Sequence, residues 1–333
     1  MNKILTIVVP SYNVERTLRE TVDSFLDERV LGELEVLIVN DGSKDSTEEI
    51  GKDYELRFPN TVRLISKENG GHGSTINRGI VECTGKYFKV VDGDDWVNTE
   101  DLVLLIDKLK NTEADYVVTD YMEVNDVTKE EKAITYDKIG NTDSILFKDI
   151  AHKYQIGMHP LFIKSSILKE NKIRLDEHCF YVDVEYVLFP IPYVETVRYF
   201  PLNIYRYRLD QVEQSVSIKG FQKHIDNHIK VIYSLADFLE NYRKIGDVSK
   251  VYYIEKRVAQ MVGDQITIFL SFDEKDKKNK KKFMVFDRVL KKKSPKIYQL
   301  SGSESGTLKL LRRTKFNFYK TIVANARKRN NLV

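Results

Sequence analysis

The chain has 333 residues, of which 42% are apolar and 31% are charged, and its formal net charge is +3. This length allows one large domain or two of ordinary size, and the composition excludes a disordered chain. No apolar run approaches the ~18 residues of a membrane-spanning helix, and Cys83 and Cys179 lack the spacing of a metal site, so we expect a cytoplasmic protein.

The first half of the sequence alternates strand and helix signals. Continuous, β-branched apolar runs predict buried strands at 5–10, 35–40, 62–66, 87–91 and 116–119. Apolar residues at helical spacing predict helices at 18–26, 74–83 and 101–111, with Asn13 expected to cap the first. This alternation predicts an α/β fold with a Rossmann-like, mostly parallel central sheet, in which ligands bind beyond the carboxyl ends of the strands.

The second part of the chain has a different pattern. We predict a boundary at 218/219, so that residues 1–218 form a catalytic domain and residues 219–333 form a helical, basic region. Residues 275–333 carry 19 Lys and Arg against 3 Asp and Glu, and the Ser- and Gly-rich stretch 301–307 is expected to be a flexible break.

The strongest chemical signal is Asp92-Gly93-Asp94-Asp95, directly after the fourth predicted strand. Three carboxylates in four residues repel each other and favour a cation, and Mg²⁺ or Mn²⁺ take oxygen ligands and bridge to substrate phosphates. Gly93 allows the sharp turn that brings Asp92 and Asp94 to one space. The alternative is an acidic surface turn, because Asp-Gly is common in turns.

Two further predicted strands end in polar loops, Pro10-Ser11-Tyr12-Asn13 and Asn40-Asp41-Gly42-Ser43. A glycine-rich segment, 69–74, opens a predicted helix, where phosphates often bind. Each of these is also explained by an ordinary capped loop. In a parallel sheet, however, the strand ends lie side by side, so we expect the loops and the acidic turn to form one site.

Together and in this order, these segments resemble family 2 glycosyltransferases, which have the GT-A fold. The resemblance is dense over residues 1–120, and it rests on Val8–Asn13, Val39–Ser43, Asn69-Gly70-Gly71 with Asn77 and Gly79, Thr84–Tyr87 and Asp92–Asp95. The motif of processive members ends in Trp and cannot be present, because the single tryptophan is Trp96. A bacterial, non-processive enzyme is therefore expected.

The resemblance also implies roles for single residues. Tyr12 and Asp41 would contact the nucleobase, Asp92 the ribose, and Asp94 the Mn²⁺ or Mg²⁺ ion, with Asp92 and His159 as further metal ligands to consider. The full set of residues expected at the donor is Pro10, Ser11, Tyr12, Asn13, Asp41, Gly70, Gly71, Asn77, Asp92, Gly93, Asp95, Arg206 and Arg208. The two arginines share one face of a predicted strand and pair either with phosphate or with acidic groups of the protein. His72 is interpreted as a solvated loop histidine.

The resemblance further implies a carboxylate base about ninety residues after the acidic turn. Asp183 matches it and Glu185 is the reserve, although the family's usual Glu before the Asp is Val182 here. The base would take a proton from the acceptor hydroxyl on the face opposite the leaving group, which inverts the anomeric centre. The alternative is a half-exposed strand whose carboxylates are solvated.

The expected function is that of an inverting glycosyltransferase, which moves a sugar from a nucleoside diphosphate sugar, UDP by resemblance, to a hydroxyl of a glycan or lipid-linked acceptor in cell-surface polysaccharide synthesis. Two alternatives are an inactive sugar-nucleotide-binding subunit, suggested by Val182, and a sugar-phosphate nucleotidyltransferase, although the first loop lacks that class's glycine-rich basic sequence.

The basic C-terminal region suggests further partners. Basic and apolar residues alternate over 308–313 and 316–326, which is typical of a helix on the inner face of an anionic membrane and equally of a cap that docks on the catalytic domain. Homodimer formation is also considered for this region. Nucleic acid is not expected, because no recognised binding module accompanies the charge.

Overall fold

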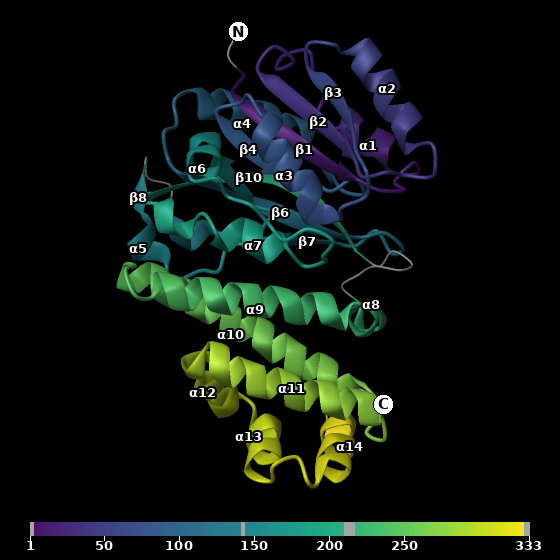
Figure 1. Cartoon of the computed structure of the whole chain (residues 1–333). Helices are drawn as coiled ribbons and strands as arrows, with labels where there is room; N and C mark the ends of the chain where they lie inside the picture. The colour runs from purple at the N-terminus through teal and green to yellow at the C-terminus, as the bar shows by residue number, and fades with distance from the viewer. Residues whose placement is uncertain (1–2, 141–143, 210–216, 330–333) are drawn as a thin grey trace. The chain divides into compact units, whose positions relative to one another are not determined.

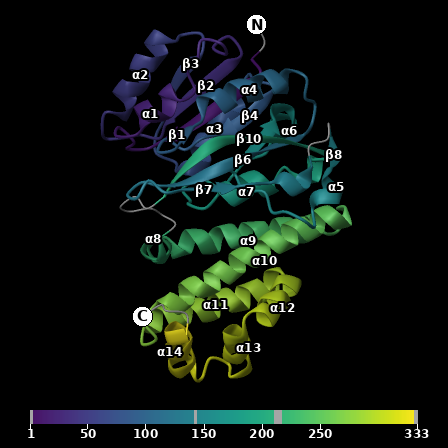
Figure 2. The ribbon, with the colours of Figure 1, turned by 180° about the vertical axis from the view of Figure 1, so that it is seen from behind.

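The computed structural model describes residues 3–140, 144–209 and 217–329. The chain divides into two compact units, Met1–Val212 and Glu213–Val333, whereas the sequence places the boundary at 218/219. The first unit is a sheet flanked by helices and the second consists of helices (Figures 1 and 2).

Four parallel strands at one side of the sheet position the loops of interest. They are β1 Leu5–Ser11, β2 Leu34–Asn40, β3 Val62–Ser66 and β4 Tyr87–Val90, in the spatial order β3-β2-β1-β4. Every residue of β1, β2 and β4 is buried, which is why these strands are continuous apolar runs rather than alternating ones. The predicted strand positions are confirmed within one or two residues.

The other side of the sheet is mixed. Its path continues from β4 through β9 Leu161–Lys164, β6 Tyr116–Asn125, β10 Thr196–Leu209 and β5 Trp96–Val97, while β7 Glu131–Ile134 pairs with β6 and β8 Ile145–Leu146 pairs with β10. The β9 strand is antiparallel to both β4 and β6, and β10 is parallel to β6. The sheet is therefore mostly parallel in direction, with antiparallel strands that the sequence did not predict.

Helices cover the sheet: α1 Leu18–Asp23, α2 Thr47–Arg57, α3 His72–Glu82, α4 Thr99–Lys110, α5 Phe147–Ile150, α6 Ser165–Glu170 and α7 Asp183–Leu188. The predicted helices correspond to α1, α3 and α4. Asn13 does not cap α1, because the helix begins after Thr17 and Asn13 has a left-handed φ of 54°. The carbonyl of Val14 accepts from the amides of Thr17 and Leu18, so a turn separates Asn13 from the helix.

The second unit contains α8 Ile218–Lys223, α9 Ile225–Tyr242, α10 Val248–Ser271, α11 Lys277–Lys293, α12 Pro295–Glu304, α13 Gly306–Arg313 and α14 Tyr319–Arg329. Side-chain caps start five of them, from Ser217, Asp247, Asp276, Ser294 and Ser305. The predicted break over 301–307 is wrong, because residues 301–304 continue α12 and residues 306–307 begin α13, which leaves Ser305 between the two helices. In the described parts of the chain, no helix is long and apolar enough to span a bilayer.

Candidate functional site

Backbone hydrogen bonds hold the ends of β1, β2 and β4 together. The amide of Asp41, just after β2, donates to the carbonyl of Ser11 at 2.8 Å, and the amide of Gly93, after β4, donates to that of Pro10 at 3.2 Å. Asn13 joins the first two loops, because its amide donates to Oγ of Ser43. Pro10 and Ser11 are themselves buried in β1. The strand-end loops thus form one surface, as the parallel sheet predicts.

A pocket of about 470 Å³ opens at the ends of β1, β2 and β3. Tyr12 stands at its edge with 51% of its surface exposed. The rest of the lining is Asn40, Gly42, Lys44, Glu48, Ser66, Lys67, Glu68 and Asn69. An exposed aromatic ring beside backbone and amide groups suits a flat, polar ring such as a nucleobase.

Asp41 is only 2% exposed and is held by several donors. Its Oδ1 accepts from the amide of Gly70 at 2.9 Å and from Nζ of Lys67 at 2.5 Å, and its Oδ2 accepts from the amide of Gly71 at 2.8 Å. Asn69 Nδ2 donates to the Asp41 carbonyl. Asp41 therefore organises the glycine-rich segment, in addition to any contact with a base.

The glycine segment is shaped by another part of the protein. Gly71 has a left-handed φ of 81°, and a Cβ there would lie 3.2 Å from the backbone of His178 and Cys179. A Cβ on Gly73 would lie 2.1 Å from the Asp176 carbonyl oxygen. Because Asp41 already accepts from the amides of Gly70 and Gly71, those two amides are not available to a phosphate in this arrangement.

Asn77 likewise bonds within the protein. Its Nδ2 donates to the Leu175 carbonyl at 2.9 Å and to Oε1 of Glu177 at 3.0 Å, and its Oδ1 accepts from the Leu175 amide at 2.8 Å. These three bonds use both N–H donors of the Asn77 amide and one of the two acceptor positions of its oxygen. Instead of presenting Asn77 to a donor, the structure uses it to fix residues 175–177 against α3.

Asp92 is paired with His72, the first residue of α3. Nε2 of His72 lies 2.8 Å from Oδ1 of Asp92. Burial alone would lower the pKa of His72, but the charge and hydrogen bond of Asp92 outweigh it and raise that pKa. Burial opposes ionisation of Asp92, but His72 lowers its pKa overall. The interpretation of His72 as a solvated loop residue is therefore wrong; a histidine in a helix-opening position near an acidic turn was the signal available.

Asp94 has a different environment. Among the described residues, no side chain of another residue donates to its carboxylate. Burial and the neighbouring Asp92 charge raise the pKa of Asp94 to about 6. Burial and a neighbouring negative charge thus make the ionised form of Asp94 unfavourable, and a bound cation would stabilise that form.

The described residues contain no group of three or more His, Cys, Asp or Glu side chains placed to hold a metal ion. Asp92, Asp94 and His159 therefore do not form a ready-made cage. The donor set still fits Mg²⁺ or Mn²⁺, which commonly use one or two carboxylates and complete their shell with substrate phosphates and water.

Asp95 joins the acidic turn to β10. It is 2% exposed; its Oδ2 accepts from the hydroxyl of Tyr205 at 2.5 Å, and its Oδ1 accepts from the Arg208 amide at 2.8 Å. Burial, together with the charges of Asp94 and Asp92, raises the pKa of Asp95 well above its usual range. Asp95 has a structural role in this arrangement, and a donor contact would need one of these bonds to be exchanged. Gly93 is enclosed beside it, and its carbonyl accepts from Thr17.

The guanidinium of Arg208 is occupied by protein groups. Nη1 donates to Asp126 at 2.9 Å, Nη2 donates to Glu20 at 2.6 Å, and the group lies 4.4 Å from the centre of the Trp96 ring. From the sequence, Arg208 was expected to pair either with phosphate or with acidic groups of the protein, and the structure shows the pairing with acidic groups. Arg206 is half-buried and donates to Oδ1 of Asn203 at 2.8 Å.

Asp183 is the first residue of α7 and is half-buried. Its charge contributes to raising the pKa of His72, and that of Tyr207 after burial and the three acidic-turn carboxylates. Asp183 therefore lies within electrostatic reach of the acidic turn. Glu185 is fully buried and its Oε2 accepts from the Asp176 amide at 2.8 Å, so it is poorly placed for an acceptor. The half-exposed strand considered for this segment is wrong, because residues 183–188 are helical.

His159 lies in an aromatic group. Its ring stacks on Tyr207 at 4.2 Å between centroids and also contacts Tyr205 and Tyr121. Burial lowers the pKa of His159 to about 4. Lys89, fully buried on β4, donates to the carbonyls of Met158 and His159 and fixes this loop. A neutral imidazole can bind a metal, but in this structure the His159 ring packs against the neighbouring tyrosine rings.

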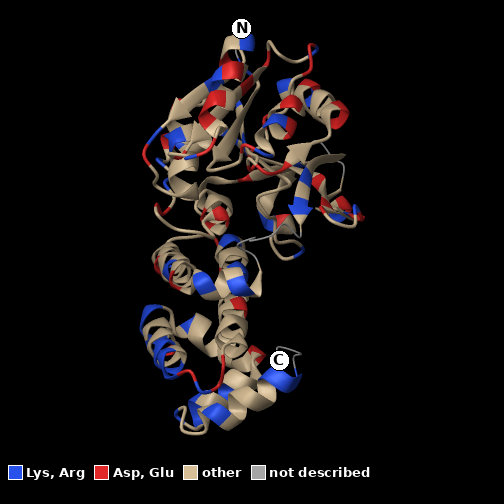
Figure 3. Ribbon diagram, turned by 90° about the vertical axis from the view of Figure 1, so that its right-hand side faces the viewer, with Lys and Arg blue, Asp and Glu red and all other residues tan. Residues whose placement is uncertain are grey.

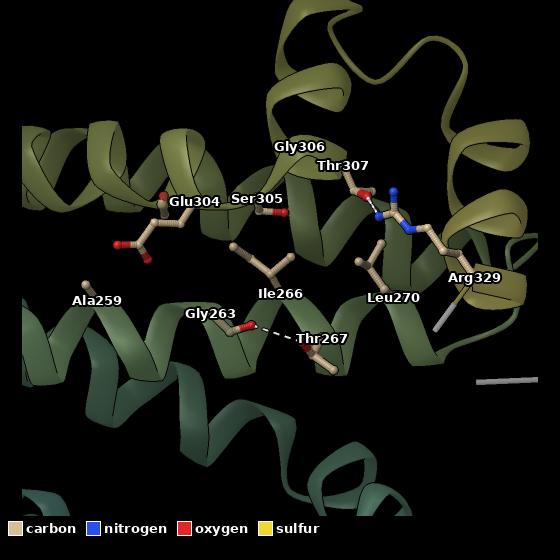
Figure 4. Close-up of a pocket in the computed structure, with 11 residues that line it drawn as sticks. Ala259, Gly263, Ile266, Thr267, Leu270, Glu304, Ser305, Gly306, Thr307 and Arg329 are labelled. Atoms are coloured by element: carbon tan, nitrogen blue, oxygen red, sulfur yellow. Dashed lines mark hydrogen bonds between the residues drawn. The ribbon is translucent and has the colours of Figure 1, made fainter. Parts of the chain in front are cut away.

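A second pocket, of about 360 Å³, lies within the second unit beside α10 (Figure 4). Its lining includes two charged residues of opposite sign, Glu304 and Arg329, and Arg329 donates to Thr307 at 3.2 Å. Mixed charge and small residues do not select one class of ligand.

The strand order, with an acidic turn directly after β4, defines the GT-A class of nucleotide-binding folds. A sequence model for the family described as Glycosyl transferase family 2 matches residues 6–169, so this part of the chain is a domain of that family. The sequence-level resemblance and the fold class are thereby confirmed.

Individual relatives agree with this assignment. The uncharacterised glycosyltransferase EpsJ of Bacillus subtilis is 38% identical over 117 residues, 35% of this chain and 33% of EpsJ. The minor teichoic acid biosynthesis protein GgaB of B. subtilis is 31% identical over 182 residues, 54% of this chain and 20% of GgaB. The matches thus span a third or less of these two curated relatives.

Among solved structures, S. aureus TarS 1–349 in complex with UDP-GlcNAc has a TM-score of 0.63 at 16% identity, covering 98% of this chain and 92% of that one. A likeness at this identity concerns the fold.

Proposed function

We propose that the chain is an inverting glycosyltransferase that moves a sugar from a nucleoside diphosphate sugar to an acceptor hydroxyl. The observation that carries this proposal is the position of the acidic turn: its Gly93 amide bonds to Pro10 at the end of the strand whose next loop carries the pocket residue Tyr12, and the charge of Asp183 acts on His72, the partner of Asp92. Nucleotide, sugar and acceptor would then meet around Asp92 and Asp94. Family membership supports the reaction class.

A divalent cation, Mn²⁺ or Mg²⁺, is part of the proposal. Asp94 would hold it, with Asp92 as the second carboxylate. When bound, the ion would stabilise the negative charge that develops on the departing nucleoside diphosphate.

Asp183 is proposed as the base. It would accept the proton of the acceptor hydroxyl while the hydroxyl oxygen attacks the anomeric carbon and the bond from that carbon to the diphosphate breaks on the opposite face. Asp183 is the first residue of α7 and is half-buried, and it is not held by the backbone bond that occupies Glu185.

The comparisons suggest which substrates to test first. A TarS structure contains UDP-GlcNAc, so UDP sugars are the first donors. GgaB is named for minor teichoic acid biosynthesis, so hydroxyls of cell-surface glycans and of their lipid-linked precursors are the first acceptors.

The donor part is tested by calorimetric titration of a panel of nucleotide sugars, with and without Mn²⁺. We expect binding of one nucleotide class that Mn²⁺ strengthens, and loss of this metal effect in Asp94→Asn. Asp107→Asn, an exposed aspartate on α4, is the matched control. Absence of binding to every nucleotide, with either metal, contradicts the proposal.

The chemical part is tested with Asp183→Asn. We expect donor affinity to persist while product formation falls by about 10²–10⁴-fold, the usual contribution of a positioned base. Near-normal turnover in this variant would refute the assignment. Wild-type protein that binds donor but forms no product across the acceptor panel would favour the inactive-subunit alternative, and release of pyrophosphate from a nucleoside triphosphate and a sugar phosphate would favour the nucleotidyltransferase.

A further inference from the structure

The end of the second unit carries an unusual charge distribution. Residues 306–329, here called the α13–α14 hairpin, contain eight Lys and Arg and no Asp or Glu. The hairpin consists of α13, a turn at 314–318 and α14 (Figure 1). Blue Lys and Arg segments mark the lower end of the ribbon in Figure 3.

One side of the hairpin is fixed to the rest of the unit. Arg312 forms an ion pair with Asp287 at 2.6 Å and lies 3.5 Å from the centre of the Tyr298 ring, and Arg327 forms one with Glu274 at 2.6 Å. The buried apolar side chains on this side are Leu308, Leu311, Phe316, Tyr319, Val323 and Ala326. The hairpin thus has a defined inner side, and part of the amphipathic pattern is explained by docking within its own unit.

The other side has no protein partners to neutralise it. We call it the outer face. Five of its cations are exposed and form no ion pair with any described residue: Lys309, Arg313, Lys315, Lys320 and Lys328. Two large apolar side chains are exposed among them, Leu310 at 46% and Phe318 at 66%. Exposed apolar groups surrounded by uncompensated positive charge require an explanation.

The turn that presents Phe318 is itself strained. Lys315 and Phe316 have φ values of 49° and 62°, a left-handed conformation that residues with a Cβ seldom adopt, and here two occur in succession. The turn brings Phe316 into the core and leaves Phe318 outside. Backbone strain that the surrounding structure maintains is a recognised indication of a functional segment.

We propose that the outer face of the α13–α14 hairpin binds an anionic lipid bilayer, with Phe318 and Leu310 entering the headgroup region and the five cations contacting lipid phosphates. Charge complementarity favours this occupant, because a bilayer offers both anions and an apolar phase to one surface. A nucleic acid would satisfy the cations but not the two exposed apolar side chains. The inference concerns the second unit and does not depend on the transferase activity.

The first test uses the full chain and phosphatidylcholine vesicles with or without phosphatidylglycerol, in a sedimentation assay. We expect binding only when phosphatidylglycerol is present, and weaker binding as salt increases. Each cation near such a surface contributes about fivefold in affinity, so Lys320→Glu, which removes one positive charge and adds a negative one, should weaken binding by at least about tenfold. Lys244→Glu, at an exposed lysine outside the hairpin, should leave it unchanged; equal effects of the two substitutions would overturn the assignment.

The second test concerns the apolar part. Phe318→Ser should weaken binding by about tenfold or more, since burial of a phenylalanine side chain is worth at least that factor. Ile245→Ser is the control, at a position that is 88% exposed elsewhere in the unit. Phe318→Trp should show a blue-shifted emission on anionic vesicles and quenching by brominated lipid. Unchanged binding of Phe318→Ser, or an unshifted emission from bound Phe318→Trp, would refute insertion.

A second copy of the chain is the other occupant to test. Sedimentation velocity without lipid measures the oligomeric state of the wild type and of Phe318→Ser. If the wild type dimerises and Phe318→Ser is monomeric yet binds vesicles normally, the outer face is a self-interface and the proposal fails. If both have the same oligomeric state and only Phe318→Ser loses lipid binding, the proposal is supported.

Discussion

Replacement of Asp41 separates a structural role from direct recognition of the nucleotide. The sequence-level resemblance assigns Asp41 to the nucleobase, but the structure shows its carboxylate accepting from the amides of Gly70 and Gly71 and from Lys67. In Asp41→Asn one oxygen can still accept from Gly70 and Lys67. The new NH₂ group then faces the amide of Gly71, donor against donor.

The loss of folding free energy in Asp41→Asn can be worked out from these contacts. A buried amide without an acceptor costs about 1–3 kcal/mol, and the remaining bonds lose their charge-assisted strength. Lys67 also loses its counter-charge, but its side chain is 22% exposed, so contact with solvent reduces the cost of losing this ion pair. A total of about 2–4 kcal/mol corresponds to a fall in Tm of roughly 5–15 °C for a unit of this size.

Thermal unfolding followed by calorimetry, together with nucleotide titration, measures both roles. We expect the transition of the first unit to shift, and nucleotide affinity to fall as a consequence. Asp53→Asn is the control, because it removes a carboxylate from exposed ion pairs with Arg19 and Arg57 and should change stability by less than about 0.5 kcal/mol. An Asp41→Asn protein with unchanged Tm and weakened nucleotide binding would refute the structural argument.

Two other substitutions test the same region by thermal and denaturant unfolding. Gly73→Ala places a Cβ 2.1 Å from the Asp176 carbonyl oxygen, so α3 or the facing segment must move, and we expect a loss of more than about 2 kcal/mol. Gly157→Ala, with no atom within 4 Å of the new Cβ, should be nearly neutral; equal stability of the two variants contradicts the packing argument. Arg208→Met breaks two ion pairs and the contact with Trp96 and should cost about 2 kcal/mol, and an unchanged denaturant midpoint would show that those ion pairs are not stabilising.

The strands of the parallel side could be predicted because their physical requirement is simple. A strand buried on both faces is predominantly apolar, and β1, β2 and β4 follow that rule, while buried exceptions such as Glu35 and Lys89 are hydrogen-bonded within the protein. The β9 strand contributes only Leu161–Lys164 between two partners. Four residues carry no period that separates strand from helix, and their direction depends on chain connections that local sequence does not encode.

The roles of polar residues were harder to predict for a related reason. Asp41, Asn77 and Arg208 were expected at the donor from the family resemblance, yet in the structure they bond to amides, carbonyls and carboxylates of the protein itself. A buried polar group must find partners, and an internal partner distant in sequence satisfies it as well as a ligand does. Leu175 lies 98 positions from Asn77, so no local pattern indicates the bond.

The acidic turn shows how three adjacent carboxylates coexist before any ligand binds. Asp92 has a lowered pKa because His72 compensates its burial, Asp94 titrates at about 6, and Asp95 has a strongly raised pKa beside the Tyr205 hydroxyl. Asp92 is thus paired with His72, and both oxygens of Asp95 accept hydrogen bonds, from the Tyr205 hydroxyl and the Arg208 amide. Among the described residues, Asp94 is therefore the carboxylate of the turn without a side-chain donor, and the raised pKa of Asp94 reflects the cost of this arrangement, which a bound divalent cation would offset.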